Sequence, residues 1–175
     1  MSNFTIHQLN NITEDFPKDY FIETGTYLGE TTMLAANVFE NVFSIEASPP
    51  LFLRAARGMR TVRRPNFLIG DTRHVLPLLI EAINGPIVFY LDAHWFKQTD
   101  EPVTKRFGFP LFDELDIIVE KQKDECIIIV DDVHAFGQAK YGWSEVTEET
   151  IRGRVNHVQQ AYVTGDQYVL VRDRD

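Results

Sequence analysis

Acidic and histidine side chains follow two apolar runs of the sequence directly. Asp92 and His94 come after the run I-V-F-Y-L, and Asp131, Asp132 and His134 come after C-I-I-I-V. If the runs are neighbouring parallel strands, three carboxylates and two imidazoles converge at one edge of a sheet. So much like charge requires a cation or protonation. Oxygen ligands favour Mg²⁺, with Mn²⁺ or Ca²⁺ as alternatives, whereas coordination by His94 or His134 would favour Mn, Fe or Zn.

A glycine-containing stretch, E-T-G-T-Y-L-G-E-T-T over residues 23–32, follows another apolar pair. Gly25 and Gly29 permit a tight strand-to-helix turn and close approach of a ligand, while Thr31 and Thr32 open a helix whose free N–H groups face the same side. The stretch differs from the dinucleotide fingerprint G-x-G-x-x-G, and no Gly-Lys-Ser/Thr follows it. It predicts a site for a small polar ligand, although ordinary turn glycines explain the stretch equally well.

Two further acids end apolar runs. Glu46 ends V-F-S-I-E about 20 residues after Gly25, the spacing from which a carboxylate accepts hydrogen bonds from ribose hydroxyls. Asp71 follows N-F-L-I-G, where it either caps a helix beginning at Thr72 or receives an adenine amino group. The order of these residues favours a nucleoside ligand.

Short apolar runs alternate with segments of helical spacing, which predicts an α/β fold. Runs that are apolar on both pleat faces indicate strands of a doubly wound, mostly parallel sheet with helices on both faces. A Gly-Asp turn near the C-terminus predicts a terminal β-hairpin, and long loops are expected at Trp95–Pro110 and His134–Trp143. The predicted strands are Tyr20–Glu23, Val42–Glu46, Asn66–Ile69, Ile87–Leu91 and Cys126–Val130, and the predicted helices are Thr31–Glu40, Pro49–Arg60 and Leu111–Lys123.

Composition limits the classes of function. The 175 residues, 44% of them apolar, suit one domain over residues 1–175, and the net charge of −9 argues against a nucleic-acid partner. No apolar stretch is long enough for a membrane span, and the N-terminus lacks the pattern of a signal peptide. The single cysteine, Cys126, lies in an apolar run and fits a reducing compartment. We therefore expect a cytoplasmic protein without membrane or nucleic-acid partners.

With these segments in order, the sequence resembles class I S-adenosylmethionine-dependent methyltransferases from about Tyr20 to the C-terminus. Glu23, Gly25 and Gly29 match the first motif of that class, whereas its middle glycine is replaced by Tyr27. The variant Glu-x-Gly-x-x-x-Gly-x-Ser/Thr is typical of metal-dependent small-molecule O-methyltransferases of the caffeoyl-CoA and macrocin types. The resemblance implies a Rossmann-like methyltransferase fold.

The resemblance also assigns roles to residues. It implies that Glu23 and Gly25 contact the methionine portion of S-adenosylmethionine, Glu46 the ribose, and Asp71 with Thr72 the adenine. The remaining residues expected to bind the cofactor are Thr26, Tyr27, Gly29, Thr31, Ala47 and Asp92.

By the same resemblance, Asp92, Asp131 and Asp132 match the acids that bind a divalent ion in those O-methyltransferases. The ion's expected role is to lower the pKa of an acceptor hydroxyl and to align its oxygen with the methyl group. The expected catalytic residues are His94, as the general base, and Asp92. Alternatively, the Asp-Asp pair caps a loop and the histidine is structural.

The sequence thus predicts a methyltransferase, with divalent-metal-assisted O-methylation of a small hydroxylated acceptor such as a sugar or a natural-product scaffold. Two alternatives stay open: a metal-dependent hydrolase or lyase that uses the same acids, and a non-catalytic nucleoside-binding module. Many small-molecule methyltransferases enclose their acceptors with a large N-terminal helical cap, which the sequence lacks. A homo-oligomer in which a second subunit supplies that wall is therefore plausible.

Overall fold

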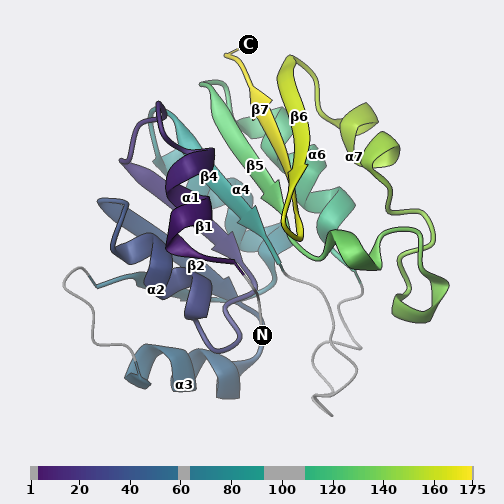
Figure 1. The fold of residues 1–175 in the computed structure, drawn as a ribbon. Coiled ribbons are helices and arrows are strands. Elements are labelled where there is room, and N and C mark those ends of the chain that lie inside the picture. The colour runs from purple at the N-terminus through teal and green to yellow at the C-terminus, as the bar shows by residue number, and fades with distance from the viewer. Residues whose placement is uncertain (1–3, 59–63, 93–108, 175) are drawn as a thin grey trace.

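The structure is a computed structural model that describes residues 4–58, 64–92 and 109–174. These residues form a seven-stranded sheet with the strand order β3-β2-β1-β4-β5-β7-β6 (Figure 1). The strands are β1 (Tyr20–Thr24), β2 (Asn41–Glu46), β3 (Asn66–Ile69), β4 (Ile87–Leu91), β5 (Cys126–Val130), β6 (Val158–Thr164) and β7 (Gln167–Arg172).

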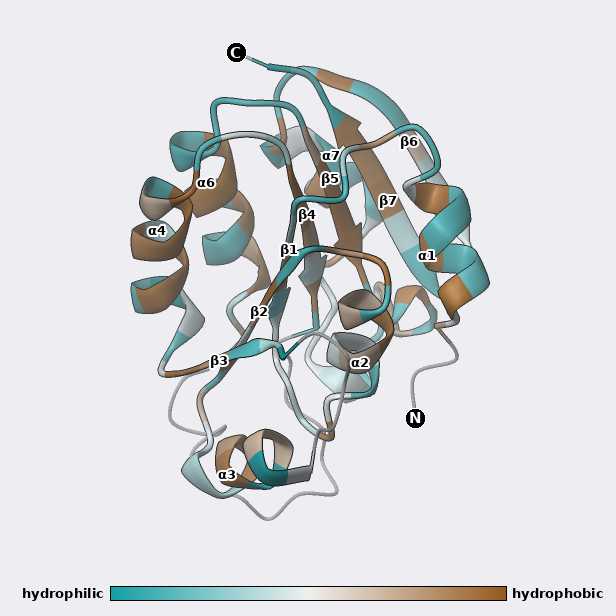
Figure 2. Ribbon diagram, turned by 90° about the vertical axis from the view of Figure 1, so that its left-hand side faces the viewer, coloured by the Kyte–Doolittle hydropathy of each residue, from teal (hydrophilic) through white to brown (hydrophobic). Residues whose placement is uncertain are grey.

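Helices cover both faces of this sheet. The view along the sheet in Figure 2 shows α4 and α6 on one face and α1 and α2 on the other, with their apolar sides toward the strands. The α-helices are α1 (Ile6–Ile12), α2 (Glu30–Ala36), α3 (Pro49–Gly58), α4 (Thr72–Ala82), α6 (Leu111–Lys121) and α7 (Glu148–Arg154). Two 3₁₀ turns, η1 (Val133–Ala135) and η2 (Ala139–Tyr141), follow β5.

The strand order reverses at β1. This strand pairs in parallel with β2 on one side and with β4 on the other, and β4 pairs in parallel with β5. The chain therefore builds the sheet outward in both directions from β1. Ligands of open α/β sheets bind outside the carboxyl ends of the strands at such a reversal, which places the expected site at the ends of β1 and β4.

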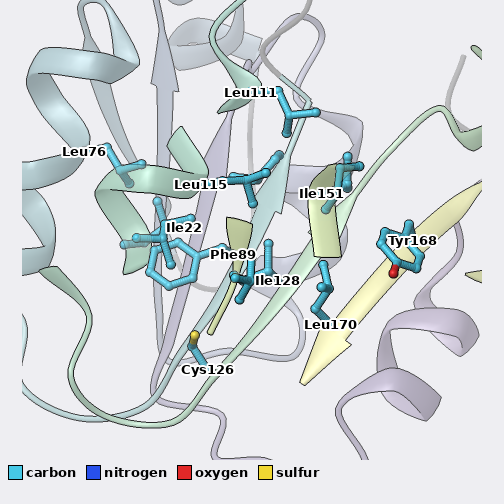
Figure 3. Packing of buried hydrophobic residues seen from close by; sticks show 14 of the residues in the cluster. Ile22, Leu76, Phe89, Leu111, Leu115, Cys126, Ile128, Ile151, Tyr168 and Leu170 are labelled. Carbon is cyan, nitrogen blue, oxygen red and sulfur yellow. The ribbon is translucent and has the colours of Figure 1, made fainter. Parts of the chain in front are cut away.

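Alternate residues of the central strands supply two separate cores. Ile22, Phe89 and Ile128 pack with Leu76 of α4 and Leu115 of α6 on one face (Figure 3). Their neighbours in sequence point to the other face, where they pack against α1 and α2. Burial of each large side chain contributes roughly 1.5–3 kcal/mol, so two-sided burial makes β1, β4 and β5 the rigid base of the strand ends.

The structure confirms the predicted fold class, and each predicted strand lies within one residue of the observed strand. The predicted helix over Thr31–Glu40 ends earlier, at Ala36, because the chain must turn before β2 begins. Asn37 takes part in that turn by donating a side-chain hydrogen bond to the carbonyl of Met33.

The C-terminal hairpin is also confirmed. Its strands β6 and β7 pair antiparallel, and Gly165 takes a left-handed conformation, with a φ of 62°, in the turn between them. It is β7 that pairs with β5, also antiparallel, which leaves β6 at the edge of the sheet.

Of the two predicted loops, only one lies mainly within the described residues. The predicted loop His134–Trp143 includes the last two residues of η1 and all of η2, so this connection is more regular than predicted. The predicted loop Trp95–Pro110 lies outside the described residues except for Phe109 and Pro110. Within the described chain, none of the helices combines the length and apolar character of a membrane span. A cytoplasmic location stays a prediction.

Candidate functional site at the strand ends

The carboxyl ends of the parallel strands form one continuous edge. The backbone N–H groups that follow β1, β3, β4 and β5 each donate to a carbonyl of the neighbouring strand, so the ladder extends beyond these strands. The donors Gly25, Gly70, Asp92 and Asp131 reach the carbonyls of Ile45, Glu46, Thr24 and Leu91 at 2.9, 2.9, 3.0 and 3.2 Å. These bonds place the glycine turn beside Glu46 and the two strand-end aspartates beside each other.

Glu23 lies beneath the glycine turn and is 1% exposed. Its carboxylate accepts hydrogen bonds from the hydroxyls of Thr32, in α2, and Ser44, in β2, the latter at 2.5 Å. Burial raises the pKa of Glu23 to about 7, against the opposing effect of these hydroxyls, and the charge of Glu46 raises the pKa further. Glu23 therefore ties the turn to its neighbours, and its contact with a methionine group stays a prediction.

The turn itself uses left-handed backbone conformations at three residues. Gly25, Tyr27 and Gly29 have φ angles of 83°, 47° and 74°, and Gly29 is the N-cap of α2. Such angles favour glycine, so the departure from the glycine-rich motif at Tyr27 falls on a strained position. The Tyr27 side chain is 51% exposed, and the other predicted turn residues, Thr26 and Thr31, are buried.

Glu46 faces this turn from the end of β2. Its Oε2 accepts a hydrogen bond from the N–H of Tyr27 at 2.9 Å, and its Oε1 accepts one from the N–H of Ser48 at 2.8 Å. These bonds fix the carboxylate and leave a further lone pair on each oxygen. Ala47, between Glu46 and Ser48 in sequence, is partly buried. The neighbouring Ser48 Oγ is buried without a hydrogen-bond partner. An oriented acceptor beside an unpaired hydroxyl fits the two hydroxyls of a ribose.

Asp71 caps α4, which is one of the two roles that the sequence predicted for it. Its Oδ1 accepts the N–H of Arg73 at 3.0 Å, and the Arg73 guanidinium bonds both carboxylate oxygens at 3.0 and 2.7 Å. These Arg73 hydrogen bonds lower the pKa of Asp71, so the group is a charged acceptor. The adenine contact predicted for Asp71 and Thr72 stays a prediction.

Glu114, which the sequence analysis did not single out, lies between two predicted cofactor loops. It comes from the first turns of α6, is 1% exposed, and accepts a hydrogen bond from the hydroxyl of Thr24 at 3.2 Å. Burial raises its pKa to about 7. Its Oε1 has no hydrogen-bond partner. Glu114 thus links α6 to the end of β1, with one buried oxygen atom unsatisfied.

The acids after β4 and β5 act on one another. Burial raises the pKa of Asp92 well above its ordinary value, and the charges of Asp131 and Asp132 raise it further. Asp131 is 3% exposed and accepts the Tyr90 hydroxyl at 2.7 Å and the Gln167 amide at 2.8 Å. Burial also raises the pKa of Asp131. The acids on the neighbouring strands therefore share one electrostatic environment, which a cation would stabilise.

Asp132 points to a different set of neighbours. It takes a left-handed conformation, with a φ of 61°, and its ligand atoms lie within 4.8 Å of those of His134 and Asp166. The sequence predicts Asp166 only as part of the hairpin turn, because its position near the end of β5 depends on the antiparallel pairing of β7 with β5. His94, the predicted base, lies outside the described residues.

Comparisons with known proteins agree with the observed fold. No protein-family profile and no curated protein sequence matches the chain. Among solved structures, the O-methyltransferase from Bacillus cereus in complex with S-adenosylhomocysteine matches with a TM-score of 0.69 at 16% identity, over 99% of this chain and 82% of that one. The O-methyltransferase TomG from Streptomyces achromogenes, in complex with S-adenosylmethionine, matches with a TM-score of 0.62 at 14% identity, over 97% and 78%.

An N-methyltransferase also shares the fold. NodS from Bradyrhizobium japonicum matches with a TM-score of 0.61 at 11% identity, over 97% of this chain and 94% of that one. The chain therefore has the Rossmann-like fold of S-adenosylmethionine-dependent methyltransferases, and at these identities the likeness establishes the fold alone.

Proposed function

We propose that this chain is an S-adenosylmethionine-dependent methyltransferase that methylates a hydroxyl group of a small acceptor, such as a sugar or a natural-product scaffold. The observation that carries the proposal is the contact between the left-handed turn after β1 and the Glu46 carboxylate, which the N–H of Tyr27 holds at 2.9 Å. This contact joins the two expected parts of a nucleoside site at the point where the strand order reverses. The fold shared with methyltransferases supports the same function.

The chain's own residues would bind the cofactor in three places. Gly25 permits close approach of the methionine portion, Glu46 accepts the ribose hydroxyls, and the loop at Asp71 and Thr72 faces the adenine. The bound cofactor supplies the methyl group. Glu23 holds α2 and β2 around the turn through its hydrogen bonds with Thr32 and Ser44, and its contact with the methionine portion is part of the proposal.

The acids at the ends of β4 and β5 would serve the acceptor. Asp92, Asp131 and Asp132 form the proposed site for a divalent ion, Mg²⁺ or Mn²⁺, because burial and then the charges of Asp131 and Asp132 raise the pKa of Asp92, and a cation would relieve both effects. Such an ion lowers the pKa of a hydroxyl bound to it. His94, two residues beyond Asp92 in the sequence, is the proposed proton acceptor.

Two measurements test the proposal. S-adenosylhomocysteine should bind saturably in calorimetry, and methyl transfer to a panel of hydroxylated acceptors should stop in EDTA and return on addition of Mg²⁺ or Mn²⁺. Asp131→Asn and Asp132→Asn should weaken binding of the ion. Absence of both heat and thermal shift with S-adenosylhomocysteine would end the methyltransferase proposal, and binding without transfer would instead favour a nucleoside-binding module.

A further inference from the structure

The β6–β7 hairpin brings a third polar side chain to the residues that follow β5. In Figure 1 the turn between β6 and β7 lies beside the segment after β5, and the N–H of Val133 donates to the carbonyl of Asp166 at 2.9 Å. The N–H of His134 donates to Asp166 Oδ1 at 2.8 Å. Segments 32 positions apart in sequence are thereby held together through both backbone and side-chain atoms.

Three potential ligand atoms meet at this junction. His134 Nδ1 lies 2.7 Å from Asp166 Oδ2 and 3.7 Å from Asp132 Oδ1. Around an ion with metal–ligand distances of about 2.0–2.2 Å, neighbouring ligand atoms lie about 3.0–3.5 Å apart. The two distances from His134 lie on either side of this range, and all three ligand atoms lie within 4.8 Å of one another, so side-chain rotations would bring them to one ion.

A hydrogen bond between His134 and Asp166 accounts for only part of the arrangement. The Nδ1 atom carries one hydrogen or one lone pair, and the contact with Asp166 uses it. A second carboxylate, that of Asp132, is held close by the left-handed backbone of its own residue. Two carboxylates around one imidazole nitrogen are the combination that a divalent cation stabilises.

We propose that Asp132, His134 and Asp166 bind a divalent transition-metal ion, with Zn²⁺ preferred over Mg²⁺. The imidazole ligand sets this preference, because Mg²⁺ takes oxygen ligands whereas Zn²⁺ readily takes histidine nitrogen. Asp132 is common to this set and to the ion site proposed with Asp92 and Asp131, so His134 and Asp166 are the ligands that distinguish the two sites. The side chains of His134, Asp166 and Asp132 are 53%, 32% and 23% exposed. The ion therefore keeps positions open toward solvent, where an acceptor oxygen can bind.

The binding claim does not depend on methyl transfer, whereas the placing of an acceptor oxygen on this ion rests on the proposed function. The experiment therefore measures ion binding in the absence of any cofactor. The full chain, stripped with EDTA and dialysed, is titrated with Zn²⁺ and separately with Mg²⁺ in a calorimeter, and with Co²⁺ while the visible spectrum is recorded. Binding of S-adenosylhomocysteine is measured separately on the same sample.

The wild type should bind one Zn²⁺ at least about tenfold more tightly than Mg²⁺. His134→Ala and Asp166→Asn should each weaken Zn²⁺ binding by about 10- to 100-fold or more and reduce the Co²⁺ spectrum. Asparagine at position 166 still offers an oxygen to the N–H of His134, so this variant preserves the turn. The control His7→Ala removes an exposed imidazole of α1 that contacts Asn11, and it should leave Zn²⁺ affinity unchanged.

Three results would overturn the proposal: a wild type without saturable Zn²⁺ binding, equal affinity for Zn²⁺ and Mg²⁺, or a folded His134→Ala variant that binds Zn²⁺ as tightly as the wild type. Melting curves establish that each variant is folded, and His134→Gln replaces His134→Ala if the latter is not. A protein that binds S-adenosylhomocysteine but not Zn²⁺ refutes this inference alone. One that binds Zn²⁺ but not S-adenosylhomocysteine refutes the proposed function alone.

Discussion

The replacement Glu46→Ala tests the central contact of the proposed nucleoside site. Glu46 is 7% exposed, and each of its oxygens accepts one backbone N–H, from Tyr27 at 2.9 Å and from Ser48 at 2.8 Å. The remaining lone pairs of the two oxygens are the proposed acceptors for ribose. Alanine at this position removes the charged acceptor and leaves the strand end otherwise intact.

Two effects on free energy follow from this geometry. Hydrogen bonds to a charged group contribute about 1.5–3 kcal/mol, so the dissociation constant for S-adenosylhomocysteine should rise by roughly 10- to 150-fold. The N–H of Ser48 also loses its acceptor in a residue that is 0% exposed. An unsatisfied buried donor costs about 1–3 kcal/mol, so the free energy of unfolding should fall by that amount.

Calorimetry with S-adenosylhomocysteine and urea unfolding measure the two effects separately. Glu40→Ala is the matched control, because it removes the same charged group from an exposed position just before the opposite end of β2. It should leave both quantities nearly unchanged. The reasoning fails if folded Glu46→Ala protein binds S-adenosylhomocysteine within about twofold of the wild type, since no ribose contact of a charged acceptor is that weak.

Three further predictions concern stability. Burial raises the folded-state pKa of Glu23 and Glu114 from 4.5 to about 7, so the stability that these groups contribute is fully present below about pH 4.5 and is lost as the pH rises through 7. The variant Glu114→Gln should therefore show a smaller fall of the unfolding free energy over this pH range, measured by urea unfolding without metal. Gly70→Ala should lower the melting temperature and weaken S-adenosylhomocysteine binding, since φ is 153° and an added Cβ would lie 2.8 Å from Val75 Cγ2. Leu115→Ala should cost about 2–5 kcal/mol of unfolding free energy in urea without changing ligand affinity per folded molecule, because Leu115 is fully buried in the core under α6.

The sequence was sufficient to predict the sheet because its signals were local. Apolar runs such as Ile87–Leu91 and Cys126–Val130 are buried at every residue, and two-sided burial of that kind leaves few alternatives to a central parallel strand. The helix Thr31–Glu40 was predicted too long because periodicity does not show where a chain must leave a helix to enter the next strand. Boundaries depend on tertiary structure, whereas the elements themselves do not.

The site could be predicted only in part, for a similar reason. Glu46 and Asp71 could be predicted because Glu46 ends β2 and Asp71 comes two residues after the end of β3. Glu114 and Asp166 were missed because they lie on a helix and in a hairpin turn, where an acid usually faces water. Their roles arise from the packing of α6 against the end of β1 and from the pairing of β7 with β5, which no local pattern records.

The buried acids at the strand ends are costly for the fold, and this cost is itself an argument for function. A shift of the pKa from 4.5 to about 7 corresponds to roughly 3 kcal/mol of differential free energy for each of Glu23 and Glu114. An amide in place of either carboxyl would hydrogen-bond the same neighbouring hydroxyls without that penalty. The acidic residues on the surface explain the net negative charge of the chain. They do not explain why carboxyl groups also gather where β1, β4 and β5 end. A cationic ligand explains this gathering of carboxyls, because a positive charge at that edge converts the repulsion between the carboxylates into attraction to the ligand. The sulfonium of S-adenosylmethionine and a divalent ion are both such cations.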